Sequence, residues 1–332
     1  MWLMLVIDFY SVKSDSHQAA SMPLWLVDGT LYLLALFQIV NIALLVIMAS
    51  RLNWGSSSEI VAAIMNLFTV KVVVGTSSSF SGIVVAHEFL HRRESHFSLL
   101  GRFLLALSCY EHFSTEHLRG HHYRVGTEED AATARFGETF RAYWRRTLPA
   151  QFKSAWRLEC GRLNLVSPLD ARWLRHRVLQ GILVEGLLIF AIAWFFGPVA
   201  LFAFLLQAGV AVQKLEAVNY IEHWGLSRRG STDPTSLSWD SDSWFTLHTL
   251  TGLSQHADHH HSPGKPYPRL THRPESPKLP YGYFCMVFLA ISRNDLFQRL
   301  LTRELESRCL GPFAAEKTEG RVDVREGKST TF

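Results

Sequence analysis

The residues from 31 to 49, LYLLALFQIVNIALLVIMA, form a run of nineteen without a charged side chain. Because a helix rises about 1.5 Å per residue, a run of this length crosses the ~30 Å hydrocarbon core of a bilayer. Trp25 and Trp54 flank the run, at positions that interfacial aromatic residues often occupy. The run therefore predicts a transmembrane helix, and the rest of the chain must fold beside a bilayer.

Further apolar stretches predict a bundle of such helices rather than a single anchor. We expect them at 60–86, 99–112, 178–196 and 199–218. Gly197-Pro198 separates the last two, which indicates a tight hairpin. A soluble protein with buried helices is the alternative, but several of the runs reach spanning length. Residues 1–10 are apolar too, yet they lack the basic start and small-residue cleavage site of a signal peptide.

Polar stretches at 113–177 and 219–280 are predicted to form a cap on this all-α, polytopic transmembrane bundle. Between residues 117 and 177 there are twelve Lys and Arg against six Asp and Glu, whereas the connector 50–59 has one of each. The positive-inside rule therefore predicts a cytoplasmic cap. We expect a single domain over residues 1–310, followed by a polar, flexible tail over 311–332. The formal net charge of +4 gives no sign of a nucleic-acid binder.

Histidine is in excess: the chain has 16, of which seven lie between 87 and 122 and six between 248 and 272. In HEFLH, His87 and His91 are four residues apart and share one helix face, and EHLRGHH and QHADHH repeat that spacing. Packing so many imidazoles together is costly unless a metal compensates, so the pattern predicts a metal centre. His17 and His176 lie outside these groups and look incidental.

A carboxylate stands beside a histidine in each group, as expected of residues that accept the second N–H of a metal-bound imidazole. These carboxylates are Glu88, Glu116, Glu222 and Asp258. Nitrogen-rich ligation fits iron, zinc, copper or nickel, and the number of histidines makes two ions the natural count. Haem would need isolated histidines inside the spans, whereas these histidines are clustered at the span ends. A zinc protease built on HEFLH would use about three ligands and would leave the other histidines unexplained.

The chain contains no CxxC and no GxGxxG, which excludes a fused rubredoxin-type, iron–sulfur or common dinucleotide-binding domain. If the protein carries out redox chemistry, its electrons must therefore arrive from a separate protein.

Seven strings carry a likeness to one family: HEFLHRRE (87–94), EHLRGHH (116–122), TEEDAATARFGET (127–139), NYIEHWGL (219–226), WDSDSWF (239–245), QHADHHHSPGKPYPRL (255–270) and LPYGYFCM (279–286). Together they resemble the membrane-bound alkane 1-monooxygenases, within the integral-membrane fatty-acid desaturase and hydroxylase superfamily. The chain departs from the family's pattern at Phe89-Leu90, Trp224, Gln255 and 291–296, and its apolar region before His87 is short. These departures bear on the substrate rather than on the histidines.

The resemblance implies a histidine-ligated di-iron centre with nine ligands: His87, His91, His117, His121, His122, His223, His256, His259 and His260. It also implies O2 as co-substrate and electrons from soluble rubredoxin, or ferredoxin with its reductase. The implied reaction is hydroxylation of a terminal or methyl C–H of an alkane-like or alkyl-aromatic substrate. The implied location is a bacterial inner membrane, with the metal site on the cytoplasmic side.

The sequence also indicates residues around the proposed ligands and two alternative functions. Residues expected around the ligands are Glu88, Glu116, Asn219, Glu222 and Asp258, and candidates for contacting a substrate or partner are Lys71 and Lys214. One alternative function is a related oxidation of a fatty acid, either desaturation or oxidative decarboxylation to a 1-alkene. Another is a non-catalytic metal- or haem-binding membrane protein.

Overall fold

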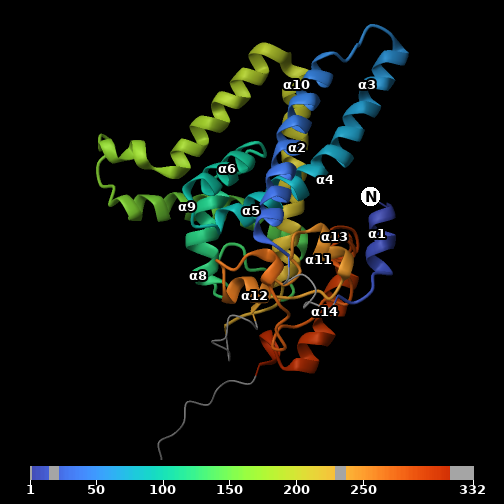
Figure 1. The fold of residues 1–332 in the computed structure, drawn as a ribbon, viewed down its shortest axis with the longest axis vertical. Coiled ribbons are helices and arrows are strands. Elements are labelled where there is room, and N and C mark those ends of the chain that lie inside the picture. The colour runs from blue at the N-terminus through green and yellow to red at the C-terminus, as the bar shows by residue number, and fades with distance from the viewer. Residues whose placement is uncertain (1, 15–21, 229–236, 315–332) are drawn as a thin grey trace, which may run out of the picture.

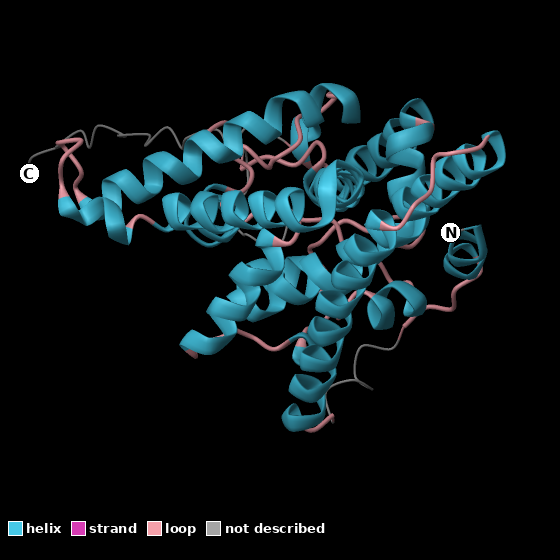
Figure 2. Ribbon diagram, turned by 90° about the horizontal axis from the view of Figure 1, so that it is seen from above, coloured by secondary structure: helices cyan, strands magenta, loops and turns pink. Residues whose placement is uncertain are grey.

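The computed structural model describes residues 2–14, 22–228 and 237–314. Within these ranges the chain forms helices and no strand, as Figure 2 shows, so the all-α prediction is confirmed. His17 and most of the expected tail at 311–332 lie outside the described residues.

The helices follow one another along the chain, with longer connections before α9, α11 and α13. Their bounds are α1 (Trp2–Phe9), α2 (Leu24–Ser50), α3 (Ser57–Thr69), η2 (Val70–Val74), α4 (Gly75–Ser77), η3 (Ser78–Val84), α5 (Val85–Leu90), α6 (Ser95–Ala106), α7 (Phe113–Glu116), η4 (His117–His121), α8 (His122–Arg124), α9 (Phe140–Leu163), η5 (Ala171–Arg175), α10 (Arg177–His223), α11 (Trp244–Thr249), α12 (His256–His261), η7 (Tyr267–Arg269), α13 (Tyr283–Ser292), α14 (Asn294–Arg308) and η8 (Gly311–Phe313).

Three of the described helical stretches are long and apolar enough to cross a membrane: α2, the continuous stretch Ser57–Leu90, and α10. Their outer faces expose large apolar side chains, which suits contact with lipid and not with water. Examples are Leu36, Phe37, Met65, Phe68, Leu187, Phe190 and Trp194. The protein is therefore a membrane protein with a helical transmembrane bundle.

The predicted span at 99–112 differs from what the structure contains. That stretch is divided between α6, which ends at Ala106, and the turn that follows it. The 12 residues of α6 rise about 18 Å, which is less than the hydrocarbon thickness of a bilayer. The short helix instead packs against α5 and buries Phe97 and Leu104 in the core.

The long helix α10 breaks at Gly197, at the place where the sequence predicts a hairpin turn. Gly197 has φ 83° and ψ 176°, so the helix axis changes direction there, and Pro198 begins the second segment. Figure 1 shows the two segments meeting at the end of the bundle where the α2–α3 connection also lies. The α12 helix lies at the opposite end (Figure 1), so the segment after Gly197 descends towards it.

Hydrogen bonds hold the stretch Ser57–Leu90 at its start and in its middle. At its start, Ser56 and Glu59 form a capping box, in which Ser56 N donates to Glu59 Oε2 at 2.8 Å. In its middle, the π-helical segment η3 brings Ser78 and Ser81 onto Gln38 of α2, with Gln38 Nε2 donating to Ser78 Oγ at 2.8 Å. Polar groups paired in this way lock two membrane helices together, and so they fix the level at which α5 ends.

The interpretation of His176 as incidental misses a structural role. His176 is fully buried, and its Nδ1 accepts a hydrogen bond from Leu179 N at 3.1 Å at the N-terminus of α10. A side-chain acceptor at this position satisfies one of the free N–H groups of a helix start, so His176 is the N-cap of α10.

We predict that Gly197→Ala destabilises the fold, because the φ and ψ of Gly197 are accessible essentially to glycine alone. A Cβ at this position would meet nothing within 4 Å, so the cost is conformational and not steric. We expect the free energy of unfolding in detergent to fall by about 1–3 kcal/mol. The matched control is Gly186→Ala in the helical first segment, where the space is equally open and alanine is the better helix former. An equal loss of unfolding free energy in both variants would contradict the conclusion that Gly197 adopts a backbone conformation that only glycine tolerates.

Candidate metal centre

Two groups of four histidines lie side by side where the helix ends converge. The first group consists of His87, His91, His117 and His259, and the second of His121, His223, His256 and His260. Within each group, one ligand atom from every ring lies within 4.8 Å of the others. Eight of the nine histidines that the resemblance implies as ligands therefore come together as two sets of metal-sized dimensions.

The ninth histidine, His122, lies between the two groups. Its Nε2 is 3.0 Å from His117 Nε2 and 3.2 Å from His259 Nε2, both of which belong to the first group. Its ring centroid is also 4.6 Å from that of His260 in the second group. His122 therefore lies next to both groups, with its Nε2 atom nearest the first.

A π-helical turn decides which histidines of EHLRGHH share a group. The sequence predicts that His117 and His121 lie on one helix face, but the structure assigns them to different groups. In η4 the His122 N–H bonds to the His117 carbonyl, five residues back, so the turn is wider than an α-helical one. His122 rather than His121 therefore faces His117, and His121 points to the second group. Such π turns are frequent at functional sites.

The short helix α12 also contributes to both groups. His256 and His260 are four residues apart, and their Nε2 atoms approach to 3.1 Å within the second group. His259 lies on the neighbouring face of the helix and joins His87 and His91. One helix turn therefore spans the two groups and sets their spacing.

The chemistry of these rings fits a metal and not a cluster of charges. Burial, together with the neighbouring imidazoles, holds the pKa of the cap histidines well below its ordinary value, so their rings are neutral and can donate a lone pair. This holds for His91, His117, His122, His256, His259 and His260. Among the described residues, His87 Nε2, His121 Nε2 and His223 Nε2 are buried without a hydrogen-bond partner. A bound cation is what would satisfy them.

Two acceptors orient the rings of the second group from outside. His121 Nδ1 lies 2.9 Å from Asp130 Oδ2, and His223 Nδ1 lies 2.9 Å from the Leu237 carbonyl. Bonds of this kind fix the tautomer that leaves Nε2 free for a metal. Sequence reasoning missed Asp130, which lies nine residues after His121. Its position inside the string TEEDAATARFGET, which resembles the family, could have indicated a role.

The carboxylates next to histidines in the sequence mostly bond elsewhere. Glu88 pairs with Arg92 at 3.0 Å, and Asp258 accepts from Lys265 at 2.6 Å and from the Thr271 N–H at 2.8 Å. These bonds hold the loop 262–273 against α12. Glu116 lies 3.5 Å from Arg124, and burial raises the pKa of Glu116 to about 7.

Glu222 and Asn219 lie at the centre itself. Glu222 Oε2 is 3.3 Å from His256 Nε2, and both side chains line a narrow cavity beside the histidines. Asn219 donates to Glu216 Oε2 at 3.3 Å. Glu216 is a second residue that the sequence reasoning missed: it is fully buried and accepts from Tyr110 at 2.9 Å, and this bond ties α10 to the chain before α7.

An apolar cavity approaches the histidines from the bilayer side. The narrow cavity beside His87, His117 and His256 measures about 20 Å³, and a larger one of about 230 Å³ adjoins it. Ser79 and Val218 line both. Of the two candidate lysines, Lys214 lines the larger cavity, whereas Lys71 is exposed on η2.

Comparison with known proteins finds a matching family model and several similar sequences. The family model described as fatty acid desaturase matches residues 62–286. Alkane 1-monooxygenase 1 of Pseudomonas aeruginosa is 39% identical over 224 residues, which is 66% of this chain and 58% of that protein. Alkane 1-monooxygenase of Acinetobacter baylyi is 34% identical over 249 residues, or 72% of this chain and 60% of that protein. The chain thus spans less than two thirds of the length of these relatives.

We predict that Asp130→Asn weakens metal binding, because it removes the anionic acceptor that holds His121 in place. The affinity for ferrous iron, titrated into metal-free protein, should fall by about 10–100-fold. The matched control is Asp170→Asn in an exposed loop, where the carboxylate pairs only with Arg172 within the described structure. Unchanged affinity in a folded Asp130 variant would show that Asp130 does not support the centre.

Proposed function

The chain belongs to the fatty acid desaturase family, and from that premise we propose that it is a membrane di-iron monooxygenase acting on an alkyl chain. The observation that carries the proposal is the pair of four-histidine groups with His122 between them. The relatives that it matches are named alkane 1-monooxygenases. We propose two iron ions, with O2 as co-substrate. The chemistry that bound iron would supply is the activation of O2 for the oxidation of a C–H bond.

The proposed ligands are the nine histidines His87, His91, His117, His121, His122, His223, His256, His259 and His260. Glu222 is a candidate for a direct carboxylate ligand because it faces His256 in the cavity. Asp130 orients His121, while Glu88, Asp258 and Asn219 hold the surrounding backbone and helices through the contacts described above. Glu116 belongs to the same buried surroundings through Arg124.

The protein's share of the chemistry is positioning and the exclusion of water. An unactivated C–H bond offers no polar handle, so an apolar passage must bring it to the metal. Ile83, Leu215 and Val218 line the narrow cavity next to His87. In the proposed reaction, one oxygen atom of O2 enters the C–H bond and the other leaves as water, with two electrons and two protons supplied from outside the chain.

We further propose that the centre lies on the cytoplasmic side of a bacterial inner membrane. The helix ends that carry histidines adjoin the basic stretch 117–177. The α2–α3 connection, which contains Arg51, lies at the opposite end of the bundle (Figure 1). An excess of Lys and Arg on one side favours that side as cytoplasmic.

A soluble rubredoxin or ferredoxin with its reductase is the proposed electron donor. A groove on the cap is lined by five arginines and three acidic residues: Arg124, Arg135, Arg146, Arg157, Arg162, Glu128, Glu129 and Asp130. Asp130, at the floor of this groove, contacts His121 of the proposed metal centre. A basic surface attracts an acidic carrier and raises its association rate.

Oxidation of a fatty acid, by hydroxylation, desaturation or decarboxylation to a 1-alkene, is a second candidate function. A specific observation favours it: a lysine, Lys214, lies in the wall of the apolar cavity that leads to the histidines. An uncharged alkane would offer no counter-charge to a lysine at this position.

The test compares two adjacent histidines of α12. His260 is buried in the second group, whereas His261 is exposed. We predict that purified protein holds about two irons per chain and shows no haem absorption band, and that His260→Ala lowers iron content and abolishes turnover. His261→Ala should retain both. Turnover is measured by product analysis with O2, a reconstituted electron chain, and alkane, alkyl-aromatic and fatty-acid substrates. A single zinc ion, or full activity of the His260 variant, would overturn the proposal.

A further inference from the structure

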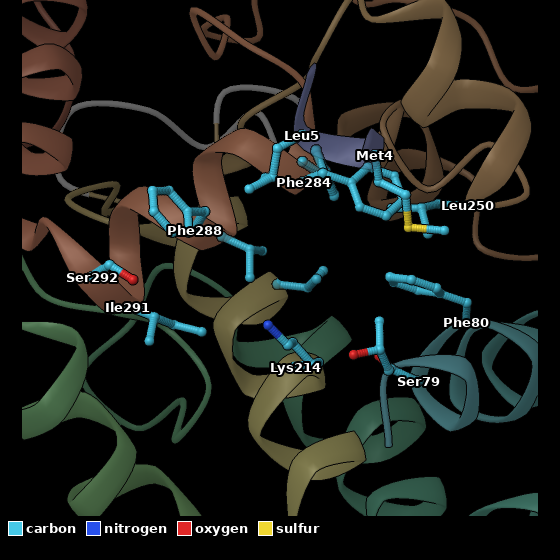
Figure 3. A pocket seen from close by; sticks show the side chains of 14 residues that line it. Met4, Leu5, Ser79, Phe80, Lys214, Leu250, Phe284, Phe288, Ile291 and Ser292 are labelled. Carbon is cyan, nitrogen blue, oxygen red and sulfur yellow. The ribbon is translucent and has the colours of Figure 1, made fainter. Parts of the chain in front are cut away.

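The larger cavity is an apolar chamber walled mainly by α1, α4, η3, α10 and α13, and one charged side chain lines it. Figure 3 shows Ser79 and Phe80 of η3 on one side and Phe288 and Ile291 of α13 on the other. Met4 and Leu5 of α1 close a third side, together with Phe284, whose ring contacts that of Phe80. Lys214 of α10 extends its amino group into the middle of this space (Figure 3).

The short helix α1 is fixed firmly enough to act as a wall of this chamber. Asp8 is buried, and its Oδ1 accepts from Ser243 Oγ at 2.7 Å and from Thr246 Oγ1 at 2.8 Å. Its Oδ2 accepts from the Cys285 N–H at 3.0 Å. These bonds tie α1 to α11 and α13, so the chamber is a built feature and not a gap at a chain end.

Among the described residues, no carboxylate pairs with the Lys214 amino group and no other group forms a hydrogen bond with it. An ammonium in apolar surroundings is costly unless a counter-charge accompanies it, and ionisable residues within membrane helices usually serve a function. The hydroxyl groups nearby belong to Thr76, Ser79 and Ser292, which are neutral donors. The missing negative charge is therefore one that an occupant of the chamber would carry.

Lys214 is aligned with the metal centre along a single helix face. Lys214, Val218 and Glu222 are spaced by four residues on α10, so they lie one above another. The eight residues from Lys214 to Glu222 correspond to a rise of about 12 Å. Val218 lines both cavities, so a chain that starts at Lys214 passes Val218 and reaches the level of the histidines.

We propose that Lys214 binds the carboxylate of a free fatty acid whose alkyl chain runs past Ser79 and Val218 to the metal centre. This inference rests on the proposed di-iron function and names its substrate as an acid, which the relatives' names do not. One cation with neutral hydroxyl donors matches a monoanion, whereas a phosphate would need more positive charge and a thioester would leave the lysine unpaired. The fixed distance from Lys214 to the centre also means that oxidation falls at a set distance from the carboxylate.

The test is binding of radiolabelled dodecanoate to the purified full-length protein in detergent, measured by equilibrium dialysis, with methyl dodecanoate as the uncharged analogue. We predict that Lys214→Met weakens dodecanoate binding by roughly 10- to 100-fold, the range for a lost hydrogen bond to a charged group, and leaves the methyl ester unchanged. Lys214→Arg should restore most of the loss. The matched control is Lys71→Met, which removes the exposed lysine of the neighbouring membrane helix.

Turnover separates failure of this inference from failure of the proposed function. If the wild-type protein oxidises dodecane and dodecanoate, and Lys214→Met loses only the acid, both proposals hold. If Lys214→Met affects neither the binding nor the oxidation of dodecanoate, the lysine does not recognise a carboxylate, although the monooxygenase stands. Lack of any O2-dependent product, with charge-dependent dodecanoate binding intact, would overturn the proposed function and retain the binding site.

Discussion

The close packing of imidazole rings where the helix ends converge is the constraint on which the rest of the structure depends. Their nitrogens approach to about 3 Å, as between His91 and His117 at 2.9 Å, and burial keeps the cap rings neutral. Neutral rings whose lone pairs face a common centre repel one another unless a cation lies between them. Helices from four parts of the chain must therefore end at the same level, and their outer contacts must hold them there.

The membrane bundle supplies that common level. The break at Gly197 returns α10 to the side on which α5 ends, and the bond between Gln38 and Ser78 fixes the adjacent helix against α2. The same arrangement leaves an apolar chamber beside the histidines, walled by α1 and α13. A bundle that only had to span the bilayer would have no need of such a chamber or of Lys214 within it.

Helical periodicity accounts for part of the grouping of the histidines. The i, i+4 spacing pairs His87 with His91 and His256 with His260, because an α-helix places such residues on one face. The same rule misassigned His117 and His121, because a π turn shifts the pairing to His122. Sequence adjacency also failed for Asp258, since a neighbour in a helix points about 100° away from the histidine and bonds instead to the loop beyond it.

The sequence by itself determined the apolar spans other than 99–112, the break at Gly197-Pro198 and the histidine-rich character of the proposed site, because these depend on local composition and spacing. Tertiary structure alone decided how the histidines divide into two groups, since that depends on the π turn of η4 and on which rings of α12 lie beside it. It also decided that Asp130 orients His121 from a loop and that Lys214, rather than Lys71, faces the chamber. Spacing along a chain fixes a side chain's face on its own helix, but only packing fixes what that face meets.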